Sequence, residues 1–258
     1  MKKEELKFSD SNLLEGMTSI SALLNTAPSV NDRKILRVQI DETKRRSKAA
    51  EIGFLTAKSK DLGFSLEFVP SEEIDRIAVG SSHGGIVAYC SDRTIPQITA
   101  EAIVPNGFYV YLEGVEDPYN FGNAIRSLYA AGVDGIVMPP RNWMSASGVV
   151  ARASAGASER LPFFIADAEK VTEIFHEAEY RILCAGIRDS VSVFEADLSY
   201  PVLLVIGGEK RGISRNILNC ADGILRIDYG REFRGSLSAS ASAAVLAFEI
   251  MRKNHFIK

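Results

Sequence analysis

The chain has 258 residues, of which 46% are hydrophobic and 24% charged, a composition typical of a globular protein with one large or two modest domains. Its formal net charge of −3 argues against a nonspecific polyanion binder, although it leaves room for a local basic face. The three cysteines lie far apart without metal-ligand spacing, which predicts a reducing compartment and no metal site. The charged amino end lacks the pattern of a signal peptide, and no apolar run is long enough to span a bilayer. We therefore expect a cytoplasmic protein that binds no membrane.

The first 95 residues predict a small alternating α/β unit. Helices are expected over residues 12–24 and 42–61, and a short one is expected from a Ser71 cap through Ile77. Strands are expected over residues 35–40, 66–70 and 86–90. Mixed polarity together with Pro96 and Pro105 then indicates a linker. These patterns predict an amino-terminal domain over residues 1–95, a linker over residues 96–106 and a second domain over residues 107–258.

A basic cluster lies near the start of the helix expected over residues 42–61. It contains Lys44, Arg45, Arg46 and Lys48, the strongest local positive charge in the chain. Such residues can contact the phosphates of a nucleic acid. A solvated helix surface produces the same run of charges, so both interpretations stay open at this point.

The second domain predicts a longer alternation of strands and helices. Strands are expected over residues 108–113, 133–138, 163–165, 181–186 and 224–228, and another leads from Val202 into Gly207. Helices are expected over residues 121–131, 170–178, 213–220 and 243–253. The first β-α-β unit is expected to be parallel and right-handed. The pattern as a whole indicates an α/β domain built on a parallel sheet.

A glycine-rich turn follows the apolar run from Val202. Gly207 and Gly208 free the backbone for a tight turn, and Glu209 stands at the carboxyl end of the strand, where open α/β sheets bind their ligands. An ordinary strand-to-helix turn with a solvated glutamate gives the same pattern. This turn also lacks the Gly-Lys-Ser/Thr ending of a P-loop, and no Gly-x-Gly follows the first strand, which disfavours a Rossmann-type methyltransferase.

Three stretches in a fixed order carry a family resemblance. They are Asn-x-Gly-x-x-x-Arg at residues 120–126, Ile-Gly-Gly-Glu-x-x-Gly at residues 206–212, and the stretch from Ile227 to Ser240 that enters the last helix. Together they resemble the three motifs of the SpoU/TrmH family of the SPOUT superfamily, the knotted RNA ribose methyltransferases. Residues 83–88 and the chain around them are similar, more loosely, to the family's amino-terminal RNA-binding domain.

The resemblance implies both a fold and a function. The expected fold class is α/β, with a carboxyl-terminal parallel-sheet domain that contains a deep trefoil knot and a small amino-terminal domain resembling a small ribosomal protein. The expected activity is methyl transfer from S-adenosylmethionine to a ribose 2′-hydroxyl of ribosomal or transfer RNA, carried out by a homodimer. The residues expected to contact RNA are Lys44, Arg45, Arg46 and Arg152.

The resemblance also assigns the cofactor site. By motif match, the backbone groups of Gly207, Ile227 and Leu237 would hold S-adenosylmethionine in a bent shape. Backbone recognition suits a glycine-rich turn, because a bulky side chain would block the N–H and C=O groups that pair with the edges of adenine. As side chains, Ile227 and Leu237 have core packing as a second and compatible role.

The catalytic residues implied by the family are Arg126, Asn120, Glu209 and Ser236. A guanidinium is always protonated, so we expect Arg126 to bind the adjacent phosphate and stabilise the emerging 2′-oxyanion rather than act as a base. Asn120 and Glu209 would orient Arg126, with Ser236 in the same network. Taken one at a time, Asn120 also fits a simple helix cap and Arg126 a surface arginine.

The chain departs from the family pattern at three positions. Ser238 stands where the family usually has Asn, Asp228 where it has Pro, and Gly208 where Asn or Ala is commoner. Serine reaches less far than an amide, which changes the hydrogen bonding expected at residue 238. A non-catalytic RNA-binding protein that has lost turnover is therefore the alternative function.

Overall fold

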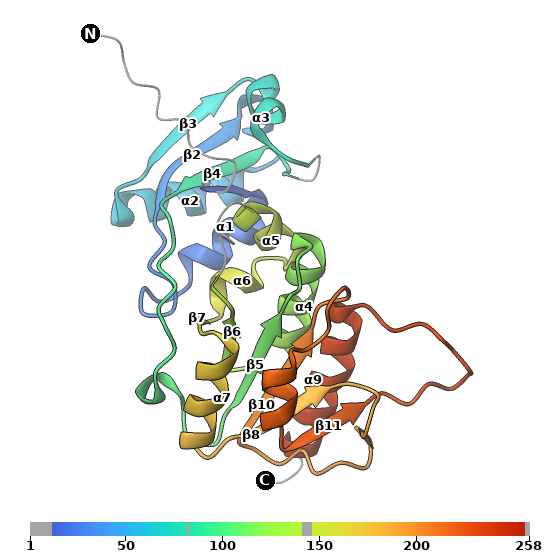
Figure 1. Ribbon diagram of the computed structural model, residues 1–258. Helices are drawn as coiled ribbons and strands as arrows, with labels where there is room; N and C mark the ends of the chain where they lie inside the picture. The colour runs from blue at the N-terminus through green and yellow to red at the C-terminus, as the bar shows by residue number, and fades with distance from the viewer. Residues whose placement is uncertain (1–11, 81–82, 141–145, 256–258) are drawn as a thin grey trace. The chain divides into compact units, whose positions relative to one another are not determined.

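The computed structural model describes residues 12–80, 83–140 and 146–255 (Figure 1). The described chain forms two compact units. The first consists of residues 12–94 and 146–160, and the second of residues 95–140 and 161–255.

The first unit is built on a four-stranded sheet. The strand order is β1 (Leu13–Glu15), β4 (Ile86–Cys90), β2 (Ile35–Asp41), β3 (Ser65–Val69), and the β2–β3 pair is parallel while the others are antiparallel. The helices of this unit are α1 (Gly16–Leu24), α2 (Ala49–Leu62), α3 (Ser71–Ile77), α5 (Ser147–Ala153) and α6 (Ala157–Arg160), with a 3-10 turn η2 (Glu42–Lys44). Apolar clusters cover both faces of the sheet, because alternate residues of each strand point to opposite sides.

Two expected helices begin later than the sequence predicts. Leu13 and Leu14 are both buried but belong to different apolar clusters, on opposite faces of the sheet, which a strand satisfies and a helix does not. The helix expected from residue 42 begins at Ala49 instead. The carboxylate of Asp41 accepts a hydrogen bond from the Thr43 N–H at 2.8 Å and closes a single 3-10 turn, so the basic cluster precedes α2.

Residues 146–160, which the predicted boundaries place in the second domain, pack within the first unit. Ala151 is fully buried in the apolar cluster that α1 and α2 cover. The carboxylate of Glu159 accepts a hydrogen bond from Asn31 at 3.0 Å and lies 3.5 Å from the guanidinium of Arg33, whose side chain is 1% exposed. A buried charged pair of this kind holds α6 firmly, because removing either partner leaves an uncompensated buried charge.

The second unit is built on a seven-stranded sheet in which every pair is parallel. The strand order is β7 (Phe163–Ile165), β6 (Gly135–Met138), β5 (Phe108–Glu113), β10 (Val202–Gly207), β8 (Arg181–Ala185), β11 (Gly223–Arg226), β9 (Val191–Ser192). Its helices are α4 (Pro118–Ala130), α7 (Ala168–Glu177), α8 (Arg215–Cys220) and α9 (Ala239–His255), with a 3-10 turn η3 (Ala100–Ala102). The parallel α/β sheet that the sequence predicts is confirmed, and the knot remains a prediction.

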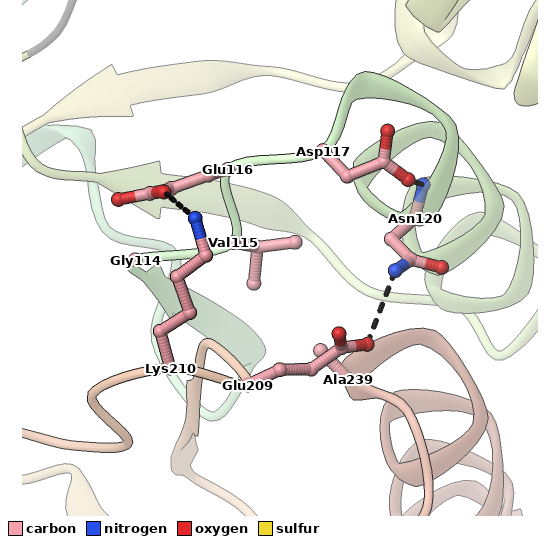
Figure 2. Close-up of a pocket in the computed structure, with 8 residues that line it drawn as sticks. All are labelled: Gly114, Val115, Glu116, Asp117, Asn120, Glu209, Lys210 and Ala239. Carbon is pink, nitrogen blue, oxygen red and sulfur yellow. Dashed lines mark hydrogen bonds and ion pairs between the residues drawn. The ribbon is translucent and has the colours of Figure 1, made fainter.

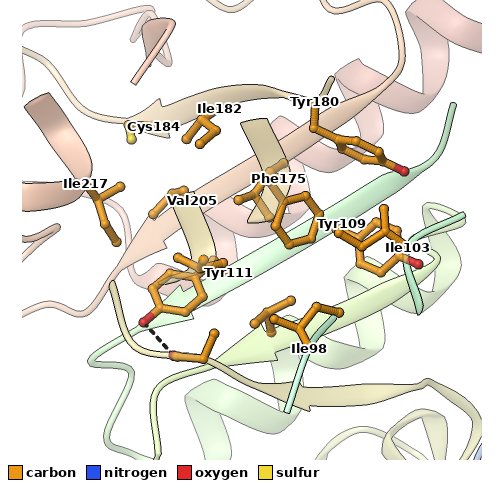
Figure 3. Close-up of a cluster of buried hydrophobic side chains, with 14 residues drawn as sticks. Ile98, Ile103, Tyr109, Tyr111, Phe175, Tyr180, Ile182, Cys184, Val205 and Ile217 are labelled. Carbon is orange, nitrogen blue, oxygen red and sulfur yellow. Dashed lines mark hydrogen bonds between the residues drawn. The ribbon is translucent and has the colours of Figure 1, made fainter. Parts of the chain in front are cut away.

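The core of this unit is rich in tyrosine and phenylalanine (Figure 3). The Tyr109 ring packs edge-on against Phe175 of α7, with centroids 5.3 Å apart, and against Tyr180, with centroids 5.8 Å apart. The Tyr111 hydroxyl donates to the Ala166 carbonyl at 3.2 Å, so its polar atom is satisfied although the ring is fully buried. These aromatic contacts fix β5 at the centre of the sheet.

The strand order places a change of winding direction beside β5. The chain adds β6 and β7 on one side of β5, and then adds β8, β10 and β11 on the other. The last residues of the two central strands are paired, Gly207 with Glu113. Open parallel sheets bind ligands at such a point, outside the carboxyl ends of the strands.

Among the described residues, no helix combines the length and apolarity that crossing a membrane requires.

Candidate functional site

The glycine-rich turn after β10 runs against the backbone that follows β5. The Gly208 N–H donates to the Glu113 carbonyl at 2.6 Å. A Cβ added at Gly208 would stand 1.9 Å from the Gly114 carbonyl oxygen, and one added at Gly207 would stand 2.3 Å from the Gly212 carbonyl carbon. These approaches are too close for any side chain, so both positions need glycine for a steric reason.

The entrance of α4 presents Asn120 to this turn. Asp117, not Asn120, is the cap of α4, because its carboxylate accepts a hydrogen bond from the Asn120 N–H at 3.0 Å and Pro118 occupies the first helical position. The side-chain amide of Asn120 is therefore available and donates to the Glu209 carboxylate at 3.1 Å (Figure 2). The first and second motifs meet through this hydrogen bond.

A small cavity of about 110 Å³ lies at this meeting point (Figure 2). Its lining residues are Gly114, Val115, Glu116, Asp117, Asn120, Glu209, Lys210 and Ala239. The Lys210 ammonium lies 3.3 Å from the Glu116 carboxylate, but the lysine side chain is 82% exposed and the pair contributes little stability. The cavity is thus small, and the side chains of Glu116, Asp117 and Glu209 place carboxylates on its walls.

A larger cavity of about 250 Å³ lies beyond Glu209, which lines both. Residues that follow β8, β10 and β11 and the first turns of α9 form its walls. They are Ala185, Gly186, Ile187, Ile206, Gly207, Gly208, Glu209, Gly212, Ile213, Leu225, Ile227, Tyr229, Ser236, Leu237, Ala239, Ser242 and Leu246. The three predicted cofactor-binding residues, Gly207, Ile227 and Leu237, therefore line one cavity, and Ser236 lines it too. The lining combines glycine backbone with aliphatic side chains, an environment that suits a small organic ligand.

Ser238 performs a definite task in place of the family's usual asparagine. Its hydroxyl accepts a hydrogen bond from the Ala241 N–H at 3.2 Å and contacts the Ser240 hydroxyl at 3.0 Å. This is the geometry of a helix N-cap, so Ser238 satisfies a free N–H at the start of α9. The departure from the family pattern preserves the position of α9 beside the cavity.

Asp228, the second departure, takes part in a hydrogen-bonded link beside the larger cavity. Its carboxylate lies 2.7 Å from the Arg226 Nε, and the guanidinium of Arg226 also donates to the Ser190 carbonyl at 2.7 Å. Hydrogen bonds from the Ser192 hydroxyl and from Arg226 lower the pKa of the Asp228 carboxyl below its usual value. The link ties the loop after β8 to the loop after β11.

Arg126 stands apart from the other predicted catalytic residues. It is exposed on α4 and lines neither cavity. Over the described ranges 12–80, 83–140 and 146–255, its guanidinium makes no hydrogen bond and no ion pair. A single chain thus brings Asn120, Glu209 and Ser236 to the cavities but does not bring Arg126 into contact with them.

The predicted RNA-binding residues lie in the first unit. Lys44, Arg45 and Arg46 are exposed, and the Arg45 guanidinium stands 3.6 Å from the centroid of the Phe68 ring. Arg152 is half-buried, with its guanidinium 3.1 Å from the buried Glu15 carboxylate. The basic cluster is therefore accessible, whereas Arg152 is engaged in an internal ion pair.

Several site residues were not identified from the sequence. The Glu113 carboxylate accepts the Ser214 N–H at 2.8 Å and braces the glycine-rich turn. Glu113 is the last residue of a predicted strand, and this position is typical of residues beside a ligand site. Ile187 and Tyr229 line the larger cavity only because the fold brings distant loops together, so no local pattern marked them.

Comparisons with known proteins cover most of the chain. The SpoU rRNA Methylase family matches residues 107–248, and the RNA 2′-O ribose methyltransferase substrate binding family matches residues 13–96. The chain is 25% identical over 260 residues to the 23S rRNA (guanosine-2′-O-)-methyltransferase RlmB of Shewanella oneidensis, covering 98% of this chain and 99% of that protein.

Solved structures share the fold. The AdoMet-bound rRNA methyltransferase from Sinorhizobium meliloti superposes with a TM-score of 0.78 at 24% identity, covering 95% of this chain and 88% of the other. The SpoU methyltransferase AviRb from Streptomyces viridochromogenes, in complex with AdoMet, gives a TM-score of 0.76 at 19% identity, covering 93% and 89%.

Proposed function

The chain belongs to the SpoU rRNA methylase family, and from this membership we propose that it transfers the methyl group of S-adenosylmethionine to a ribose 2′-hydroxyl of ribosomal or transfer RNA. One observation carries the proposal. Gly207, Ile227 and Leu237, which are assigned to the cofactor by motif match, line a single cavity although the sequence separates them. The same cavity adjoins the Asn120–Glu209 hydrogen bond.

The residues of the larger cavity fit S-adenosylmethionine. The turn at Gly207 offers backbone without a side chain, which can approach the edge of an adenine closely, and Ile206, Leu225 and Leu246 offer apolar surface. When bound, the cofactor supplies an electrophilic methyl group on a positively charged sulfur. The Glu209 carboxylate on the wall provides a charge of the opposite sign.

The chemistry of the chain's own residues follows from their charges. Asn120 donates to Glu209 and so fixes the position of its carboxylate at the boundary between the two cavities. Arg126 binds the phosphate next to the target ribose and stabilises the negative charge that develops on its 2′-oxygen, because a guanidinium offers several donors in one plane. Ser236 adds a hydroxyl at the wall of the larger cavity.

A homodimer completes this arrangement in our proposal. α4 and α9 pack against each other, and α9 begins at the cavities. Tyr129 on α4 and Phe248 on α9 are 40% and 42% exposed. Pairing two copies through these helices would bury these side chains and would place the second chain near Arg126.

The remaining expectations complete the proposal. The amino-terminal domain, residues 1–95, binds the RNA substrate, and the family match over residues 13–96 supports this role. Residues 107–258, apart from residues 146–160 that pack within the first unit, form the methyltransferase domain. Its carboxyl-terminal segment forms a trefoil knot by passing through a loop of the chain, and the protein acts in the cytoplasm. A non-catalytic RNA-binding role is not favoured, because both family matches describe methyltransferase modules and Ser238 retains a capping function.

Mass mapping of 2′-O-methyl groups tests the function directly. Ribosomal and transfer RNA from cells with and without the protein should differ at a specific ribose, and identical maps would refute the proposal. Arg126→Ala should abolish methyl transfer and leave S-adenosylmethionine binding within about twofold of wild type, because Arg126 lines neither cavity. Asn123→Ala, an exposed position on the same helix, is the matched control and should retain full activity.

A further inference from the structure

The loop between β11 and α9 carries exposed side chains of an unusual combination. Figure 1 shows this segment as the loop that extends away from β11 and α9. Within residues 229–235, Phe233 is 58% exposed, Tyr229 is 39% exposed, and Arg231 and Arg234 are exposed as well. Clustered exposed apolar side chains are typical of interaction sites.

The two aromatic rings form an anchored pair. The ring centroids of Tyr229 and Phe233 lie 5.7 Å apart at an angle of 58°. Tyr229 lines the larger cavity, and its hydroxyl accepts a hydrogen bond from the Leu237 N–H at 3.3 Å. The Phe233 ring lies over the backbone of Gly235, since a Cβ added there would stand 2.5 Å from the ring. The pair is thus held at the cavity while much of its surface faces solvent.

Cations near this pair are available for an anionic ligand. Across the parts of the chain that the structure describes, Arg231 and Arg188 form no hydrogen bond and no ion pair. Arg234 is 95% exposed and lies 4.0 Å from Glu232, a distance at which the attraction in water is weak. Arg188 directly follows Ile187, which lines the cavity. Guanidinium groups of this kind bind phosphates by paired hydrogen bonds.

We propose that the Phe233 ring, held in place by Tyr229, stacks on an unpaired base next to the methylated nucleotide, and that Arg231 and Arg234 bind the adjacent phosphates. This inference rests on the proposed function, because it names how the acceptor strand is held at the methyltransferase unit. Proteins that bind single-stranded RNA combine aromatic stacking surfaces with cations that follow the backbone. Bases inside a duplex are already stacked, so the loop selects an unpaired acceptor segment.

A protein partner is the competing occupant of the aromatic pair. Aromatic and arginine side chains are both frequent at protein interfaces. RNA is the better match, because the arginines flank the phenylalanine at positions 231 and 234 and the loop adjoins the cavity where the acceptor ribose must be presented. Binding of a second protein chain is therefore an outcome that the experiment distinguishes.

The experiment compares full-length variants in three binding measurements. An unmodified 23S rRNA transcript is the RNA probe, S-adenosylmethionine affinity is measured by calorimetry, and molecular mass by light scattering. Phe233→Ala should weaken RNA binding by roughly 5- to 150-fold, the range that one stacked base contributes, while Phe233→Trp should stay within about threefold of wild type. Phe194→Ala is the matched control, because Phe194 is 50% exposed in the same unit and lines neither cavity.

The arginines are tested by salt dependence. Replacing both Arg231 and Arg234 with alanine should lower the slope of log affinity against log salt by about 1.4, since each contact with a single-strand phosphate contributes ~0.7. S-adenosylmethionine affinity should stay within about twofold of wild type in every variant, because neither arginine lines the cavity.

Three results would overturn the inference. They are equal RNA affinity in Phe233→Ala and Phe194→Ala, a loss of cofactor affinity in Phe233→Ala as large as the loss for RNA, or a change in molecular mass that marks a protein interface. The proposed function fails separately, if the wild-type protein incorporates no methyl group into bulk RNA from cells that lack it. The RNA-binding comparison does not depend on that activity.

Discussion

Gly208→Ala tests the close approach of the two central strand ends. The added Cβ would stand 1.9 Å from the Gly114 carbonyl oxygen, where real Cβ contacts almost never fall below 3.0 Å, so one backbone must move by about 1.1 Å. Crowding of this kind costs ~1–3 kcal/mol. The movement also breaks the hydrogen bond from the Gly208 N–H to Glu113, which adds ~0.5–1.5 kcal/mol. The expected loss of stability is therefore about 1.5–4.5 kcal/mol.

The same movement displaces Glu209, the neighbouring residue that Asn120 holds. A displacement of about 1 Å in a catalytic arrangement costs on the order of 100-fold in rate, so methyl transfer should fall by that factor. Thermal unfolding should show Tm lowered by at least about 3 °C. Gly53→Ala is the control, because Gly53 is exposed on α2 with nothing within 4 Å of an added Cβ, and it should stabilise the protein by ~0.5–1 kcal/mol. If Gly208→Ala kept wild-type Tm and wild-type rate, the steric argument for this turn would be refuted.

Five further substitutions probe residues in and around the two cavities. Ser238→Ala removes the cap of α9 and should lower the free energy of unfolding, measured in urea, by ~1 kcal/mol, whereas Ser238→Asn should keep the wild-type stability. Equal urea midpoints for the wild type and both variants would contradict the capping role. Asn120→Ala and Glu209→Gln should each reduce the rate of methyl transfer. Because the two residues act through one hydrogen bond, the double variant should lose less rate than the product of the two single effects. Single effects that multiply in the double variant would exclude that coupling. The depressed pKa of Asp228 means that the hydrogen bonds it accepts from Ser192 and Arg226 stabilise the fold above the unfolded-state pKa near 3.8, and this stabilisation is lost as the pH falls through the lower folded pKa. The stability difference between wild type and Asp228→Asn should therefore be present at pH 7 and vanish in acid, and a difference that persists in acid would refute the assignment.

Local sequence patterns predict much of the fold because strand and cap signals act over short distances. The strands expected over residues 86–90 and 108–113 have the bounds of β4 and β5. The helix expected from a Ser71 cap through Ile77 ends where α3 ends, although Pro70 occupies the cap position and Ser71 is the first helical residue. The start of α1 differs because tertiary burial overrides local propensity, and the start of α2 differs because a local hydrogen bond closes a separate turn first. Leu13 and Leu14 must reach opposite faces of the sheet, and Asp41 closes a tight turn before α2 can begin.

The candidate site was predictable through its motifs rather than through its geometry. The family resemblance selected Gly207, Ile227 and Leu237, and the structure brings all three to one cavity. No periodicity indicates that loops so far apart in the chain converge. The local sequence is sufficient to identify Asp117 as the cap of α4, because an Asp followed directly by Pro is a common helix start. Asp117 therefore takes the capping role that Asn120 also fits in the sequence.

The burial of Glu159 against Arg33 has a consequence for recombination between relatives of this chain. Because α5 and α6 belong to the first unit while the chain on either side belongs to the second, no single junction separates the two units. A fragment that starts at residue 95 would retain Glu159 without Arg33, and a fragment that stops at residue 94 would retain Arg33 without Glu159. Homologous exchange that swaps substrate-recognition modules therefore has to carry both pieces together, or inherit a buried charge with no counter-ion.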